Sequence, residues 1–152
     1  MMKEGTRILP LPTEDLMDLK ERRWRVKLPT DYRDFLKENN GGIPQKNCFW
    51  HDDKHYEVYR FLCVLLKVEK SEFEINVVRT KLDNRLVYDE NLVGAEIMPI
   101  AELKSGDYVC LDFHESRYTP TVCLWNNRSS VNHAPVTYPL AKTFTEFLEM
   151  LR

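Results

Sequence analysis

Residues 28–42, LPTDYRDFLKENNGG, carry a complete helix signal. Pro29 suits a first helical turn, and the side chains that follow recur at the spacing of one helix face. That face consists of Tyr32, Phe35, Leu36 and Asn39. Gly41 and Gly42 then end the pattern, because glycine readily adopts the positive φ that a helix C-cap requires. The stretch predicts an amphipathic helix docked on a core.

Two more helices are predicted before and after this one. Thr13 precedes two acids, which suits a helix N-terminus, and Leu16 and Leu19 are candidates for the start of its buried face. Ser71 and Glu74 match a capping box, so a third helix is expected to follow them and to end near residue 85.

The strand signals lie in the second half of the chain. Residues 59–68 are almost continuously apolar, which predicts a central strand buried on both faces. Gly106 and Asp107 indicate a turn into a strand at 108–113, and 121–125 predicts its antiparallel partner.

A closing helix completes the set of elements. Thr143 and Glu146 form a second capping box, and an apolar stripe accompanies them. The stripe consists of Phe144, Phe147, Leu148 and Leu151. Together the elements predict an α+β fold, a single domain over residues 1–152, in which about four helices pack on one mixed or antiparallel sheet.

The composition is that of one folded domain. The chain has 152 residues, of which 43% are hydrophobic and 30% charged, and its formal charge is −2. No global field would attract nucleic acid or an anionic membrane. No signal peptide or membrane-spanning run is apparent, so we expect a cytoplasmic protein with reduced cysteines and with neither nucleic acid nor membrane as a direct partner.

Two groups of residues have types that suit chemistry. Cys48, His51 and His55 are metal-capable, and the two histidines would share a face if the segment were helical. A structural zinc site normally needs a second ligand pair, so a polar loop without metal or cofactor is the favoured interpretation. The types that a general acid/base nuclease would use follow a predicted strand or lie beyond it, at His114, Glu115, Arg117, Tyr118 and His133. No nucleophile or phosphate-binding loop accompanies them, so no catalytic residue is predicted.

A basic segment surrounds Trp24 and superficially resembles a nucleic-acid patch with an aromatic platform. Its cations are Lys20, Arg22, Arg23, Arg25 and Lys27. Cations are also favoured at the C-terminus of a helix, and Trp24 can anchor that helix in the core. The second interpretation is preferred.

The chain resembles the SUKH superfamily, the Smi/Knr-like domains. The amino-terminal signature is Leu28-Pro29, Tyr32, Phe35-Leu36 and Asn40-Gly41-Gly42. The order continues with Pro99-Ile100-Ala101, Gly106-Asp107, Cys110-Leu111-Asp112, Val122 with Trp125, and Phe144, Phe147 and Leu148. Two departures occur, because Glu21, Trp24 and Arg25 replace the usual Glu-x-x-Leu-Gly, and Asn126-Asn127 replaces the Asp-His that often follows the tryptophan.

The resemblance implies a binding protein rather than an enzyme. Bacterial members of the superfamily commonly act as immunity proteins, which are encoded beside polymorphic toxins, often nucleases, and block them by direct binding. Fungal relatives are regulatory scaffolds for cell-wall synthesis. We therefore expect an immunity protein, with a signalling or assembly adaptor as the alternative.

Exposed aromatic and acidic side chains are the expected contacts, because they suit the basic surface that a nuclease presents to its substrate. The expected partner-binding residues are Trp50, Asp52, Asp53, Tyr56, Glu57, Tyr59, Glu115 and Tyr118.

Overall fold

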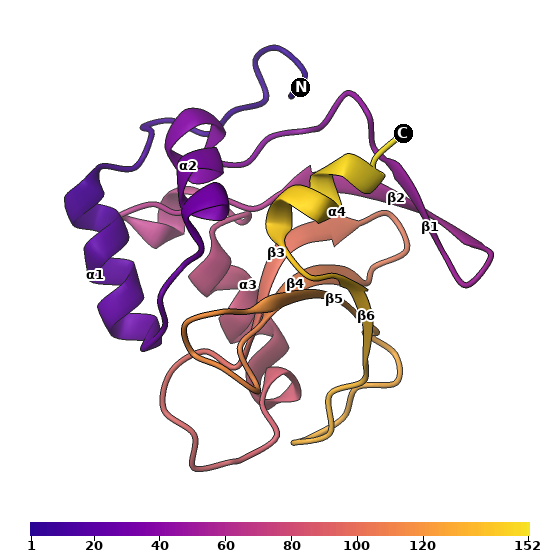
Figure 1. The fold of residues 1–152 in the computed structure, drawn as a ribbon. Helices are drawn as coiled ribbons and strands as arrows, with labels where there is room; N and C mark the ends of the chain where they lie inside the picture. The colour runs from indigo at the N-terminus through magenta and orange to yellow at the C-terminus, as the bar shows by residue number, and fades with distance from the viewer.

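A six-stranded sheet is the centre of the molecule in the computed structural model, which describes residues 1–152 (Figure 1). The strands are β1 (Cys48–His51), β2 (Lys54–Phe61), β3 (Ile97–Leu103), β4 (Tyr108–Asp112), β5 (Thr121–Trp125) and β6 (Thr137–Ala141). Each strand is antiparallel to the next, and their order in the sheet is their order in the chain. Of the two sheet types that the sequence allows, the antiparallel one is present.

Four α-helices accompany this sheet, as predicted. They are α1 (Glu14–Trp24), α2 (Thr30–Asn39), α3 (Ile75–Leu82) and α4 (Phe144–Met150), with short 3-10 turns η1 (Val68–Lys70) and η2 (Asp83–Leu86) beside α3. Figure 1 shows α2 and α4 on one side of the sheet and α3 on the other. The central strands β3 and β4 are consequently buried along almost their whole length. None of the helices combines the length and the apolar character that crossing a bilayer would need.

An aromatic cluster joins α2, α4 and β2. The ring of Phe144 lies 4.9 Å from that of Tyr32 and 5.0 Å from that of Phe35. Phe35 also meets Phe61 at 4.9 Å. Aromatic pairs at such separations and inclined angles add to the free energy of burial. The signature aromatics are therefore interior residues that fix the scaffold.

The first helix begins where the sequence predicts but turns a different face inward. The Thr13 hydroxyl accepts a hydrogen bond from the Leu16 amide and caps α1. The buried residues of this helix are Met17, Lys20 and Trp24, whereas Leu16 and Leu19 are only half-buried. The expected buried face was wrong: the helix turns Lys20 inward, and the charge of Lys20 can be buried because it pairs with Glu74 in the core.

The end of α2 is closed by an asparagine, not by the glycines. Asn40 is in the left-handed conformation, and its side chain exchanges hydrogen bonds of 2.9 and 3.0 Å with the backbone of Val64. Gly41 follows with φ +91°, and a Cβ there would lie 2.8 Å from the Phe61 carbonyl oxygen. Glycine is needed at this position for close backbone approach as well as for its φ.

The predicted central strand at 59–68 was wrong in its bounds and its place. The strand is β2, which ends at Phe61 and lies second from the edge. Residues 62–65 are also buried, and the Leu62 amide still donates to the Ile100 carbonyl oxygen of β3, but after Leu62 loops and side chains bind the backbone: the Cys63 amide donates to the Phe73 carbonyl oxygen, and the Leu65 amide to the Glu74 carboxylate. A continuous apolar run predicts burial, but only its first three residues, 59–61, belong to the strand.

The third helix has a different cap from the one predicted. Its N-cap is Glu74, whose carboxylate accepts a hydrogen bond of 2.5 Å from the Asn76 amide. Ser71 lies three residues earlier, at the end of η1. The Ser71–Glu74 capping box was therefore wrong, although a helix does follow and η2 extends it to Leu86.

The remaining local predictions are confirmed. Strands β4 and β5 pair as an antiparallel hairpin in which Cys110 faces Cys123. The Thr143 hydroxyl accepts a hydrogen bond from the Glu146 amide at the start of α4. All four cysteines are free, and all but Cys48 are buried.

Candidate protein-binding surface

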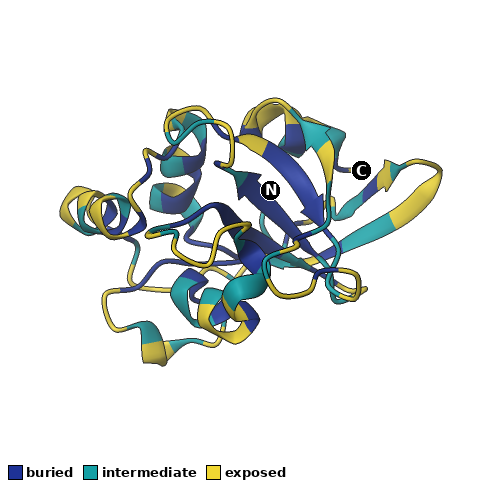
Figure 2. Cartoon of the chain, turned by 90° about the horizontal axis from the view of Figure 1, so that it is seen from below, coloured by how far each residue is buried: buried dark blue, intermediate teal, exposed yellow.

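The β1–β2 hairpin extends from the body of the molecule, as Figures 1 and 2 show. Its two-residue turn is Asp52-Asp53, with φ of 47° and 62°. Aspartate tolerates the left-handed region better than most residues, so this pair suits a tight hairpin turn. The turn therefore holds two carboxylates at the tip, and the side chain of Asp52 is 86% exposed.

The two faces of the hairpin differ in character because side chains alternate along a strand. On the inner face, Phe49 stacks on Tyr56 at 5.3 Å and meets Phe147 of α4 at 5.6 Å. The outer face carries Cys48, Trp50, His55, Glu57 and Tyr59. Of the six predicted hairpin contacts, Tyr56 thus belongs to the inner face and is half-buried.

Trp50 is the main apolar group of the outer face. It is 61% exposed, whereas Trp24 and Trp125 are buried in the core. Its ring lies edge-on to His55, its cross-strand neighbour, with 5.0 Å between centroids. A large exposed aromatic on a projecting strand is a typical anchor for a protein partner.

Strand β1 is an edge of the sheet and is only partly covered. Cys48 exchanges backbone hydrogen bonds of 3.1 and 2.8 Å with Arg152, so the end of the chain covers the start of the strand. Backbone groups alternate in direction along a strand, so the amide and carbonyl of Trp50 also point away from β2. The edge beside Trp50 can therefore accept another extended segment.

A charged pair borders the outer face. The Lys104 ammonium lies 2.6 Å from Glu57 Oε2, and this hydrogen bond lowers the pKa of the Glu57 carboxyl. Over residues 48–57 three carboxylates stand against one lysine, so the hairpin is acidic. The sequence does not indicate that Lys104 lies beside Glu57, because Lys104 belongs to the turn after β3, far along the chain.

The sequence grouped Cys48 with both His51 and His55 as metal-capable residues, but only His55 lies on the same face of the hairpin as Cys48. The segment is a hairpin rather than a helix, so His51 and His55 point to opposite faces. His51 lies near Tyr138 of β6, with ring centroids 6.0 Å apart. The group that does converge is Cys48, His55 and Glu57, whose ligand atoms lie within 4.8 Å of one another.

The other two predicted contacts lie far from the hairpin. Glu115 and Tyr118 belong to the β4–β5 loop, and both are exposed, Tyr118 by 71%. Successive strands are antiparallel, so the β1–β2 turn and the β4–β5 loop lie at opposite ends of the sheet. The structure therefore splits the eight predicted residues into two separate surfaces.

The five candidate acid/base residues do not all converge. His114 Nδ1 lies 2.5 Å from the buried Glu96 carboxylate, which also accepts a hydrogen bond from the Tyr88 amide. Arg117 donates to the Ala95 carbonyl oxygen at 2.6 Å. His133 lies in the β5–β6 loop, at the opposite end of these strands. His114 and Glu115 both line a cavity of about 800 Å³ beside the β4–β5 loop, but Arg117, Tyr118 and His133 do not, so the five residues do not form one catalytic group.

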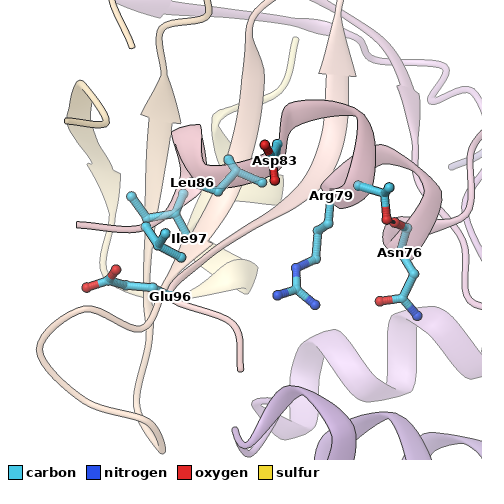
Figure 3. A pocket seen from close by; sticks show the side chains of 8 residues that line it. Asn76, Arg79, Asp83, Leu86, Glu96 and Ile97 are labelled. Atoms are coloured by element: carbon cyan, nitrogen blue, oxygen red, sulfur yellow. Dashed lines mark hydrogen bonds between the residues drawn. The ribbon is translucent and has the colours of Figure 1, made fainter. Parts of the chain in front are cut away.

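A small pocket of about 320 Å³ lies between α3, η2 and the start of β3 (Figure 3). Arg79 projects into it and makes one long hydrogen bond, of 3.4 Å, to the Gly94 carbonyl oxygen. Burial lowers the pKa of this guanidinium, which has no carboxylate within ion-pair distance. The pocket was not predicted, because its lining residues come from segments without a local motif.

The basic segment around Trp24 is not a stacking platform. Trp24 is 1% exposed, and its indole donates a 2.8 Å hydrogen bond to Asn76. Lys20 is also buried, where it forms an ion pair with Glu74. The preferred interpretation, in which Trp24 anchors the helix, is confirmed.

These features define a single α+β domain with an antiparallel sheet, a closing aromatic helix and a projecting edge hairpin. The chain belongs to the SUKH superfamily: the family model SUKH_6, described as SMI1-KNR4 cell-wall, matches residues 14–148. No curated protein and no solved structure matches the chain. The matched span contains the hairpin and all the elements from α1 into α4.

Proposed function

We propose that this chain is an immunity protein that neutralises a partner toxin by direct binding through the outer face and tip of the β1–β2 hairpin. The observation that carries the proposal is Trp50, which is 61% exposed on an edge strand that projects from the domain. Burying such a ring in a partner pocket commonly supplies a large part of the binding free energy. Membership of the SUKH superfamily supports the same class of function.

The charge of the hairpin supports a basic partner. Asp52 and Asp53 lie at the tip, next to the apolar anchor, and both are exposed. A nuclease toxin carries cations where it holds the phosphates of its substrate. Acidic groups that oppose those cations would speed association and block the substrate site. Such a toxin would act on cytoplasmic substrates, so we also place the immunity protein in the cytoplasm.

The first experiment is co-expression with the toxic domain encoded beside this chain's gene. Cell survival and co-purification of the two proteins are the expected results. Trp50→Ala should weaken the complex by about 2 kcal/mol or more, roughly thirtyfold in Kd. The matched control is Tyr118→Ala, because Tyr118 is an aromatic side chain at least as exposed as Trp50 but lies at the other end of the sheet. Loss of rescue with Tyr118→Ala alone would move the interface to the β4–β5 loop.

A second set of variants tests the charge argument. Asp52→Asn with Asp53→Asn keeps the turn, since asparagine also tolerates positive φ. The double variant should slow association and reduce its dependence on salt, while Glu115→Gln leaves both unchanged. Association measured by stopped flow at two ionic strengths separates the outcomes. Equal effects of both variants would contradict a hairpin interface.

The second candidate function is a signalling or assembly adaptor, which the cell-wall description of the matching family favours. An adaptor could use the same edge strand to bind a host protein and would have no toxin partner. Absence of rescue by a wild-type chain that is expressed and folded supports this alternative.

A further inference from the structure

Three metal-binding side chains of different types meet on the outer face of the β1–β2 hairpin. The ligand atoms of Cys48, His55 and Glu57 lie within 4.8 Å of one another. Cys48 and Glu57 are direct cross-strand partners, and His55 lies two residues before Glu57 on the same face. The convergence is therefore built into the strand register.

The Cys48–Glu57 pair is of the closer cross-strand type. Cys48 directs its backbone groups outward to Arg152, and the Glu57 carbonyl accepts from Lys104 on the other side. Residues whose backbone groups point away from each other's strand bring their side chains closest together. The sulfur and the carboxylate are thus held side by side, independently of any metal.

The three ligands lie at the surface, and the Cys48 thiol donates one hydrogen bond of 3.2 Å, to Asn47 Oδ1, which coordination would replace. His55 is exposed, and Cys48 and Glu57 are half-buried, so each can rotate toward a common centre. Lys104 binds Oε2 of Glu57, while Oε1 makes no hydrogen bond. Cys48 is also the one cysteine outside the core, because the other three are buried.

We propose that the hairpin binds one Zn²⁺ ion through Cys48, His55 and Glu57, with a fourth position open to water or to a donor from a binding partner. Thiolate, imidazole and carboxylate are the donors that Zn²⁺ takes in tetrahedral sites. Binding forms a zinc–sulfur bond and releases the thiol proton to solvent. The ion would lie beside Trp50, at the centre of the outer face. This inference does not depend on the toxin partner.

The test uses the full chain, reduced and treated with a chelator, and titrates it with Co²⁺ and then Zn²⁺. Thiolate-bound Co²⁺ gives a charge-transfer band, which in this chain is expected to come from Cys48. Because the rings of Trp50 and His55 lie 5.0 Å apart, bound Co²⁺ should also quench the Trp50 fluorescence. Zn²⁺ should displace Co²⁺ with one ion per chain and abolish the band.

Ligand variants locate the site. Cys48→Ser should remove the charge-transfer band, and His55→Gln or Glu57→Gln should weaken Co²⁺ binding roughly tenfold or more. The matched control is His51→Gln, which lies on the same hairpin but faces the opposite side. It should bind like the wild type. Trp50→Phe should lose the quenching while keeping the absorption band.

Three results would overturn the proposal: no charge-transfer band in the wild-type chain, unchanged binding by the His55 and Glu57 variants, or loss of binding in the His51 variant. Circular dichroism of each variant verifies that the fold is retained. A chain that binds Zn²⁺ but does not rescue cells, or the reverse, would separate this inference from the proposed immunity function.

Discussion

Lys20 and Glu74 form an ion pair inside the core, and replacing Lys20 by methionine tests how much the fold depends on it. The two side chains are 1% and 0% exposed, and Lys20 Nζ lies 3.0 Å from Glu74 Oε2. The same carboxylate accepts hydrogen bonds from the amides of Leu65 and Asn76. One acidic residue thus connects α1, the segment after β2 and the start of α3.

The Lys20→Met variant removes the charge but keeps most of the side-chain length. Glu74 would retain its two amide donors, yet its negative charge would be buried without a cation. Removal of one partner from a buried ion pair costs about 3–5 kcal/mol. In a domain of this size, that corresponds to a fall in Tm of roughly 6–20 °C.

Denaturant unfolding followed by circular dichroism measures the change in the free energy of unfolding. Adding Glu74→Gln should recover part of the loss, because the uncompensated charge is gone. Recovery is incomplete because glutamine has a single acceptor oxygen, so one backbone amide loses its partner at a cost of about 1–3 kcal/mol. The control is Lys37→Met, since Lys37 pairs with acids that are more than half exposed. If both lysine variants lose the same small amount of stability, the reasoning is refuted.

Three further substitutions test the backbone and the sheet. Gly41→Ala should destabilise the fold by about 2 kcal/mol or more, because its Cβ would lie 2.8 Å from the Phe61 carbonyl oxygen. Gly106→Ala, at a similar φ but with open space around it, should cost clearly less in the same denaturation assay. Burial raises the pKa of Asp112, so its ionised form opposes folding at neutral pH. Asp112→Asn, which can still accept the His114 amide, should therefore be more stable than the wild type at about pH 7, with an advantage that shrinks as the pH falls through the raised pKa. An advantage that grew toward acid pH would contradict this assignment.

The elements that were predicted correctly have local signals. Helix α4 begins directly after Thr143, whose hydroxyl accepts a hydrogen bond from the amide three residues later, and this N-cap can be recognised in the sequence. The β4–β5 hairpin was predicted from two apolar runs and a turn. In both cases the interactions that define the element involve residues close together in the chain.

The errors arise where distant residues decide the outcome. The apolar character of Val64 predicts a strand, but the side chain of Asn40, 24 residues earlier, binds its backbone amide and carbonyl groups. Lys20 looked like a surface cation, but its partner Glu74 is 54 residues away. Neither partner can be identified from a local pattern, because a sequence window contains no information about which segments meet in the core.

The sequence indicates which residue types of the hairpin suit a binding surface, but not which face of the hairpin each side chain occupies. The types of Trp50 and Tyr56 are equally suited to binding, and only the register of the hairpin decides that the first faces outward and the second inward. That register follows from Asp52-Asp53, a two-residue turn signal that had been interpreted only as charge. Once the turn is placed, period-two alternation brings Cys48, His55 and Glu57 to one face.

The family signature and the candidate surface therefore report on different parts of the molecule. Tyr32 and Phe144 match the signature because they form the aromatic core beneath α2 and α4, so changing them should cost stability. Trp50 lies on an edge strand with most of its ring in solvent, so truncating it should leave the free energy of unfolding within about 0.5 kcal/mol of the wild type. A scaffold of this kind can change its partner without changing its fold, because the residues that select the partner contribute little to the core. For this reason the sequence identifies the superfamily through buried residues, whereas the partner, on the function proposed above, would be selected by exposed residues on the outer face of one hairpin.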